Sequence, residues 1–447
     1  MKARSIAYQL VSQWTNNQGY PEALLQRAFS HHPKLSRQDK ALVTELFYGT
    51  IRWLNQLDYI IDLISSVKPD KIELRVRNLL RIGLYQIFHT HIPDPIAVYE
   101  TVEIAKKHFP KWLVRFVNAL LRTAVREKQN IRFPERDLMC CLALKYAHPL
   151  WLIKRWVREF GLEETTAMCT FNNQPPLLTL RTNTLKVKRS VLRQCLEEAG
   201  VEVEEGLAPE ALIVKRMPCS LHELPGFKSG HFLPQAEVSQ LISHLLSPKP
   251  GEVVLDACAG IGGKTTHLAQ LMRNKGQIFA IEPNLKRFNR LKRSLKKLGI
   301  DIVYPKHGAI EKIVTAFPEN YFDRILIDAP CSGLGVLRRN VDLKWQRREE
   351  DILALASLQY ALLEAVAPYL KRGKSLLYVT CTLTQEENEG VIKRFLEKFP
   401  DFQIESLVSL FPAYAKFCTS EGFFKTLPFK HHVEGFFAAR LKKGLFS

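Results

Sequence analysis

Apolar residues in the first third of the chain recur at the three- and four-residue spacing of amphipathic helices. The two prolines of IPDP (92–95) interrupt this pattern and separate neighbouring helices. We therefore predict that residues 1–135 form an all-helical domain. Its clearest helical segments are 41–64, 77–88, 96–109 and 112–125.

The segment 136–230 mixes two kinds of pattern. Residues 148–161 have the periodicity of an amphipathic helix that stops at Gly161, and residues 189–200 form a second helical pattern. Two short runs rich in β-branched residues are typical of strands. We expect a small α/β module that links the two flanking domains. Its strand-like runs are LLTLRTNTL (177–185) and ALIVKR (211–216).

From residue 231 to residue 447, short apolar runs alternate with helical patterns. This alternation predicts a Rossmann-like α/β domain with a mainly parallel sheet and helices on both faces. Ligands of such sheets bind beyond the carboxyl ends of the strands, so the residues that follow the runs are the first candidates for a site. The runs are 253–258, 277–283, 301–306, 324–330 and 375–381.

Composition narrows the class of protein. The nine cysteines are odd in number and form no C-x-x-C pair, which fits neither a zinc site nor a disulfide framework. We therefore expect no metal and a reducing cytoplasm. The absence of an 18-residue apolar run predicts no membrane span, and the first residues do not resemble a secretory signal. The net charge of +19 favours a polyanionic partner, but alone does not distinguish nucleic acid from an acidic membrane.

A glycine-rich turn, DACAGIGGKTTH (256–267), follows the first of these strands and opens a helix. Gly260, Gly262 and Gly263 allow a sharp turn and a close approach of the backbone to a ligand. The spacing is not that of a phosphate-binding P-loop. Glu282 ends the next strand, where a carboxylate can bind both ribose hydroxyls. These features favour an adenosine ligand, either a dinucleotide or S-adenosylmethionine (SAM). The alternative is a turn needed for packing and an acid that favours a helix N-terminus.

Two cysteines follow strands, in DAPCSG (328–333) and VTCTLTQEEN (379–388). A thiol is a good nucleophile once it is deprotonated, so Cys331 and Cys381 are candidate catalytic residues. The Asp328 carboxylate could accept a hydrogen bond from an amino group of a substrate, or cap the local turn. A free cysteine is often only a small buried hydrophobe. We expect that structural role for Cys140, Cys141, Cys169, Cys195, Cys219 and Cys418.

Basic residues gather in two segments near these motifs. The segment 335–349 surrounds one tryptophan, and Arg338, Arg339 and Lys344 within it are candidates for binding RNA phosphates. The segment 286–297 has seven basic residues and no acid. We interpret the second segment as the solvated face of a helix, which could also extend an RNA-binding surface.

Taken together, DACAGIGGKTTH, DAPCSG and the later TCT resemble the RNA cytosine-5 methyltransferases of the NOL1/NOP2/Sun type. The closing GFFAARLKK (435–443) is similar to the last strand of that family. In the helical region, DKALVTELFYGTIRW and FVNALLR resemble the NusB-like RNA-binding domain of its bacterial members. The resemblance therefore covers essentially the whole chain.

This resemblance implies a cofactor, a partner and roles for single residues. The cofactor is SAM and the partner is 16S ribosomal RNA. Cys381 matches the nucleophile that adds to carbon 6 of cytosine, and Cys331 matches the cysteine that assists product release. Asp328 matches the acid that holds the base beside the cofactor, and Glu282 the acid that binds the ribose. The SAM loop corresponds to Cys258, Ala259, Gly260, Ile261, Gly262, Gly263 and Lys264.

The chain departs from the family pattern at two positions of the cofactor site. Ile261 replaces the usual proline, and Gly308, next to His307, stands where an acid near the adenine is usual. The Gly308 departure keeps one alternative open, an RNA-binding assembly protein that has lost catalysis. A separate alternative is a DNA cytosine-5 methyltransferase, in which Cys331 would be the nucleophile.

Overall fold

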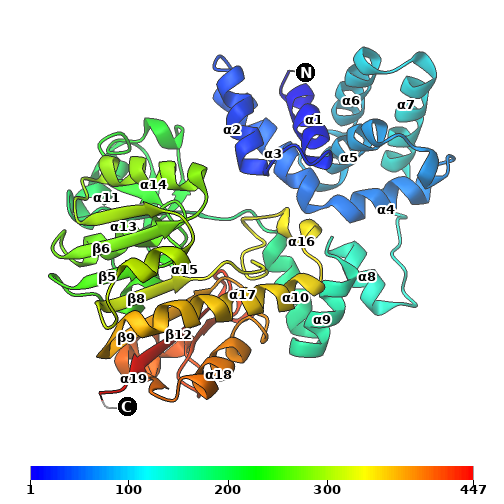
Figure 1. The fold of residues 1–447 in the computed structure, drawn as a ribbon. Helices are drawn as coiled ribbons and strands as arrows, with labels where there is room; N and C mark the ends of the chain where they lie inside the picture. Colours follow the sequence, from blue (N-terminus) through cyan, green and yellow to red (C-terminus); the bar gives the residue numbers. More distant parts are fainter. Residues whose placement is uncertain (1, 446–447) are drawn as a thin grey trace. The chain divides into compact units, whose positions relative to one another are not determined.

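The computed structural model describes residues 2–445, which divide into two compact units (Figure 1). The first unit ends at Gln174 and also includes the later segment Asn340–Gln346, while the second comprises Pro175–Arg339 and the chain from Arg347 onward. The helices just after residue 136 therefore pack with the first unit, whereas the sequence patterns had suggested a boundary near residue 135.

The first unit is all-helical, as predicted. In α7 the buried residues Val117, Leu120, Leu121 and Ala124 lie one helical turn apart, so a single face of the helix enters the core. Val341, from the later segment, is buried in the same core. The helices are α1 (Lys2–Thr15), α2 (Pro21–His31), α3 (Arg37–Arg52), α4 (Leu54–Ile64), α5 (Leu74–His89), α6 (Asp94–His108), α7 (Lys111–Arg126), α8 (Leu138–Lys145), α9 (Leu150–Phe160), α10 (Leu162–Asn173) and α16 (Leu343–Gln346).

The second unit begins with a small antiparallel sheet in the order β2-β3-β1-β4. Leu192 and Leu196 of α11 pack against Leu180, Leu212 and Phe232 of this sheet in one apolar cluster. The strand-like runs at 177–185 and 211–216 are confirmed, and the structure adds two short strands that the sequence pattern did not indicate. The elements are β1 (Leu178–Thr182), α11 (Arg189–Glu198), β2 (Glu202–Glu205), β3 (Ala211–Arg216) and β4 (Phe232–Pro234).

A larger, eight-stranded sheet forms the rest of the second unit, with its main path in the order β10-β12-β9-β8-β5-β6-β7. The strands from β9 to β7 are all parallel, and β12 pairs antiparallel with β9. This confirms the Rossmann-like prediction. The strands are β5 (Val253–Asp256), β6 (Gln277–Glu282), β7 (Val303–His307), β8 (Phe322–Asp328), β9 (Leu370–Thr380), β10 (Phe402–Ile404), β11 (Phe424–Thr426) and β12 (Phe436–Lys443).

Helices cover both faces of this sheet. The segment Glu350–Tyr369, which contains α17, is long and apolar enough to cross a membrane by length and composition alone. However, Tyr360, Leu363 and Val366 of this helix are buried in the apolar core over the sheet, which is the packing of a core helix. The helices are α12 (Glu237–Leu246), α13 (Gly263–Leu271), α14 (Leu285–Leu298), α15 (Ile310–Ile313), α17 (Glu350–Val366), α18 (Glu389–Lys398), α19 (Leu407–Leu410) and α20 (Pro428–His431).

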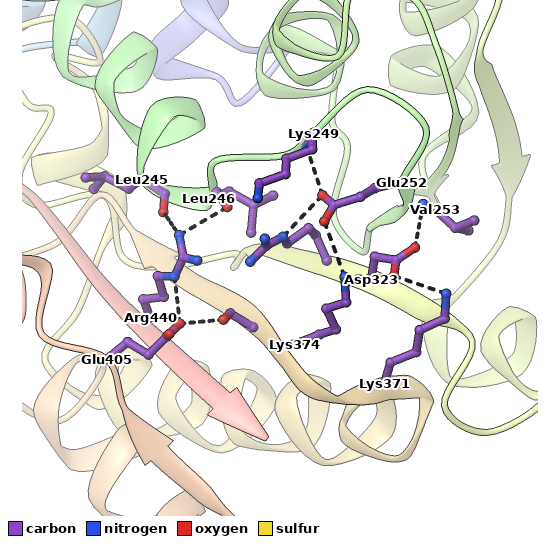
Figure 2. Close-up of polar contacts among 12 residues, drawn as sticks. Leu245, Leu246, Lys249, Glu252, Val253, Asp323, Lys371, Lys374, Glu405 and Arg440 are labelled. Carbon is purple, nitrogen blue, oxygen red and sulfur yellow. Dashed lines mark hydrogen bonds and ion pairs between the residues drawn. The ribbon is translucent and has the colours of Figure 1, made fainter. Parts of the chain in front are cut away.

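A network of charged groups stabilises the end of the sheet at which β5 begins (Figure 2). Asp323 accepts hydrogen bonds from the Val253 N–H and from Lys371, at 3.0 and 3.1 Å. Arg440 on β12 donates to Glu405 at 2.8 Å and to the Leu245 carbonyl, at the end of α12, at 2.7 Å. These contacts fix the strands at the end opposite to the candidate site.

Candidate functional site

The order of the strands places a ligand site between β5 and β8. The chain runs outward from β5 to β6 and β7 and then returns to β8 on the other side of β5. At such a switch point the loops after the two neighbouring strands diverge and leave a crevice. The glycine-rich turn follows β5, DAPCSG spans the end of β8, and TCT spans the end of β9. The topology thus brings the three sequence motifs to one edge of the sheet.

The turn after β5 has a conformation that only glycine adopts readily. Gly260 and Gly262 have φ angles of 58° and 89°, in the left-handed region where other residues are strained. A Cβ at Gly260 would meet no atom within 4 Å, so this position faces open space. Gly262 precedes α13, and the first N–H groups of that helix have no partner within the helix itself. The turn therefore offers an open cradle of backbone donors.

Asp256, at the end of β5, lies beneath the glycine-rich turn and does not reach its open side. It is fully buried and accepts a hydrogen bond from the Thr265 hydroxyl at 2.6 Å. Burial raises its pKa to about 7, because the charged form loses its hydration. Burial also raises the pKa of Cys258 in the same turn. Asp256 thus orders the start of α13, and Cys258 remains a protonated thiol.

Glu282 ends β6 and is almost completely buried. Its Oε1 accepts a hydrogen bond from the N–H of Asn284 at 2.6 Å, which holds the carboxylate at the end of the strand. Gly308, just after β7, has a φ of 144°, and a Cβ there would lie 3.1 Å from a methyl of Ile313. The backbone at this departure from the family pattern therefore favours glycine over the acid that is usual there.

Cys331 and Cys381 come together at the ends of β8 and β9. Their sulfur atoms lie 3.2 Å apart, and the N–H of Cys381 points to the sulfur of Cys331 at 3.3 Å. The hydrogen bond with the Cys381 thiol, followed by burial, raises the pKa of Cys331 well above its ordinary value. Cys331 therefore retains its proton.

Asp328 connects this pair with the glycine-rich turn. Its Oδ2 accepts a hydrogen bond from Lys264 Nζ at 2.6 Å, and one third of its side chain is exposed. Lys264 belongs to the first turn of α13, so the ion pair joins the start of this helix to the end of β8. The sequence placed both residues at the site but did not predict their contact.

Glu387 is a buried acid beside the cysteines that the sequence analysis did not single out. It is fully buried and bonds to the main chain and the hydroxyl of Ser332, the residue after Cys331. The available signal was the pair of acids at 386 and 387 in the polar stretch TLTQEEN, directly after Cys381.

The basic residues expected to bind RNA are engaged by the protein itself. Arg338 donates to the carbonyl of Pro175 at 2.6 Å, and Arg339 donates to Glu434 at 2.6 Å. Lys344 needs a correction, because it is buried in the first unit and its Nζ donates to the Ala147 carbonyl at 2.6 Å. Burial lowers its pKa well below the ordinary value. Lys344 is thus a core residue that no phosphate can reach.

Glu210, His244 and His267 form the cluster in the described part of the chain whose ligand atoms lie within 4.8 Å of one another. Glu210 accepts from His244 at 2.9 Å and lies 3.5 Å from His267. The buried guanidinium of Arg181 lies near this group and acts on Glu210 and His267 electrostatically. Glu210 thereby offsets the charge of a buried cation, while both ring nitrogens of the buried His267 have no hydrogen-bond partner among the described residues. The expectation of no metal stays a prediction.

Three family models match successive parts of the chain. The NusB family model matches residues 1–126, the model of the ferredoxin-like domain of RsmF/B-like methyltransferases matches 148–222, and the 16S rRNA methyltransferase RsmB/F model matches 243–442. The first match confirms the NusB-like prediction. The second coincides with helices of the first unit and strands of the small sheet, and the third with the large sheet.

Whole-chain comparisons agree with these models. A probable ribosomal RNA small subunit methyltransferase B of Bacillus subtilis is 36% identical over 443 residues, which are 98% of each chain. A solved methyltransferase homolog from Pyrococcus horikoshii is 31% identical with a TM-score of 0.60, over 68% of this chain and 98% of that one. NSun6 from the same organism, solved with SFG, is 26% identical with a TM-score of 0.57, over 66% and 97%. The chain belongs to the family of ribosomal RNA small subunit methyltransferase B, which are SAM-dependent enzymes that methylate ribosomal RNA.

Proposed function

We propose that this enzyme methylates carbon 5 of a cytosine in 16S ribosomal RNA and that Cys381 is the nucleophile. The observation that carries this proposal is the pair of sulfur atoms, 3.2 Å apart, at the ends of two adjacent parallel strands. A single buried cysteine would be explained by packing alone. Two thiols beside a glycine-rich turn instead suit a reaction in which one thiol attacks and the other assists.

The residues of the turn fit SAM. Gly260 leaves the space that a side chain would fill, and the N-terminus of α13 supplies backbone donors. Glu282, held at the end of β6, is placed to accept hydrogen bonds from ribose hydroxyls. We assign the cofactor contacts to the loop Cys258–Lys264, to Glu282 and to Asp328. When bound, SAM supplies an electrophilic methyl group.

The cysteines account for the activation of the base. Carbon 5 of cytosine is a weak nucleophile, and addition of the Cys381 thiolate to carbon 6 makes it enamine-like, so that it can accept the methyl group. A base such as a water molecule then takes the proton from carbon 5, and the electron pair of that C–H bond restores the double bond and expels the Cys381 thiolate. Cys331, 3.2 Å away, assists this release. Asp328 is placed to hold the exocyclic amine of the base, and its pairing with Lys264 keeps the carboxylate at the crevice.

The partner follows from the relatives and from charge. The matching family model and the B. subtilis relative are named for small subunit ribosomal RNA, and the net charge of +19 favours a polyanion. The base must leave its stack to expose carbon 6, which favours a single-stranded or loop target. Arg338 and Arg339 remain our candidates for phosphate contacts. We place the protein in the cytoplasm, where ribosomal RNA is modified.

The test compares single cysteine variants in transfer of a labelled methyl group from SAM to 16S ribosomal RNA. Cys381→Ala should lose transfer yet bind SAM normally in a calorimetric titration. Cys331→Ala should accumulate a covalent RNA adduct that is visible on a denaturing gel. Cys195→Ala is the matched control, because Cys195 is exposed and lies on α11 of the small sheet.

Each alternative has its own outcome in this experiment. Normal turnover by the Cys381→Ala variant would remove the proposed mechanism. Absence of heat on addition of SAM to the unmodified protein would support an RNA-binding protein without catalysis. Transfer of label to DNA in place of RNA would support the DNA methyltransferase alternative.

A further inference from the structure

The carboxylate of Glu387 contacts residues close to both cysteines and one residue of helix α17. Its Oε1 accepts from the Ser332 N–H at 2.8 Å and from Gln359 Nε2 at 3.0 Å. Its Oε2 accepts from the Ser332 hydroxyl at 2.6 Å and from the Thr384 hydroxyl at 2.7 Å. One buried side chain thus joins the loop of Cys331, the loop of Cys381 and helix α17.

These contacts form a closed network. The Ser332 hydroxyl also meets the Thr382 hydroxyl at 2.7 Å, one residue after Cys381. Tyr378 of β9 donates to the Glu387 carbonyl at 2.6 Å, which fixes the main chain of the acid as well. A buried carboxylate that accepts four hydrogen bonds is a strong constraint on its donors. Glu387 therefore ties the loop of Cys331 to the loop that follows Cys381.

The charge of Glu387 acts on Cys331. Its contacts to Ser332 place the carboxylate next to Cys331, and its negative charge contributes to the raised pKa of Cys331. A nearby anion disfavours a second negative charge on that sulfur. The charge of Glu387 therefore opposes the thiolate form of Cys331.

We propose that Glu387 is a positioning residue of the catalytic centre. It holds the loops of the two cysteines against each other through Ser332 and Thr384, and its negative charge opposes an anion on Cys331. This inference rests on the proposed function for its catalytic meaning, but the division of the proton between the thiols can be measured without any reaction on RNA.

The experiment measures the rate at which iodoacetamide alkylates each cysteine of the full-length protein as a function of pH, by mass spectrometry. In Glu387→Gln the amide oxygen can still accept from Ser332 and Gln359, and the amide group can donate to the two hydroxyls. The variant therefore removes the charge of the side chain and keeps its four hydrogen bonds. We expect the ratio of Cys381 to Cys331 alkylation to fall about tenfold, as for a relative shift of one pKa unit. Glu386→Gln, an equal charge change one residue away, should leave the ratio unchanged.

A second variant tests the hydrogen bonds of Glu387 separately from its charge. Glu387→Asp keeps the charge but cannot reach all four donors, so we expect an unchanged alkylation ratio and a lower kcat for methyl transfer, with the affinity for SAM unchanged. An alkylation ratio equal to that of the unmodified protein in Glu387→Gln, or a reduced ratio in Glu387→Asp, would overturn the proposal. Turnover by Cys381→Ala would instead refute the proposed function and leave the result on the thiols standing.

Discussion

Gly262, the last residue before α13, allows a quantitative test of how the cofactor turn is built. Its φ of 89° is in the left-handed region, and a Cβ there would lie 2.5 Å from Cδ1 of Leu291. Leu291 is fully buried on α14, so its side chain has little room to move away. Replacement of Gly262 by alanine therefore adds two separate costs, backbone strain and overpacking.

The sum of these costs can be estimated. A residue with a Cβ costs roughly 1–2 kcal/mol in the left-handed region, and overpacking of a core costs typically about 1–3 kcal/mol. We expect Gly262→Ala to lower the free energy of unfolding by about 2–5 kcal/mol. Gly260→Ala is the matched control, because Gly260 also has a positive φ but a Cβ there would meet no atom within 4 Å. It should lose only the strain, about 1–2 kcal/mol.

The assay is urea unfolding without cofactor, followed by circular dichroism. The double variant Gly262→Ala, Leu291→Ala isolates the clash, because the smaller residue at 291 provides the missing space. In this background the alanine at 262 should cost no more than the alanine at 260, which is a non-additive outcome. Equal losses for the two single variants, or full additivity in the double variant, would refute the steric explanation.

Three further outcomes follow from buried charges. Burial raises the pKa of Asp256 to about 7, above that of the carboxyl in the unfolded chain. The free energy of unfolding of the wild type should therefore fall by up to about 4 kcal/mol as the pH rises from about 4 to 7. Asp256→Asn should remove this pH dependence in urea unfolding. Burial would raise the pKa of Asp323, but the Val253 N–H and Lys371 outweigh it and hold the pKa below its ordinary value. Its contribution to stability should therefore be present above pH ~4 and disappear in stronger acid, and Asp323→Asn should make the unfolding midpoint less sensitive to acid. Lys344→Met should change the free energy of unfolding by less than about 1.5 kcal/mol. It should also leave the salt dependence of RNA binding unchanged. If the slope of log binding constant against log salt concentration became smaller by about one, Lys344 would bind a phosphate.

The local patterns predicted most of the architecture because helices such as α7 bury one regular face, whereas central strands such as β8 are short apolar runs buried on both faces. The runs 324–330 and 375–381 became β8 and β9, and their end residues carry the candidate cysteines. Lys344 shows where this reasoning stops, because a basic residue in a basic segment looks exposed until the fold buries it against Ala147. Glu387 was missed for a related reason. Its partners, Ser332 and Gln359, are 55 and 28 residues away in the sequence, so only the folded chain brings them together.

The short excursion of residues 340–346 into the helical core has a consequence for how the protein can be dissected. Val341 is buried there, and Trp345 Nε1 donates to the Ile51 carbonyl at 2.7 Å. The polypeptide therefore passes between the two units at three places rather than at a single linker. A fragment that starts at Pro175 would keep every strand of the large sheet. In that fragment the side chains of Trp345 and Val341 would lose the helical core that covers them and would be exposed to water. The methyltransferase half is thus not an excisable module, and its recombinant fragment should aggregate unless the helical half is supplied in trans.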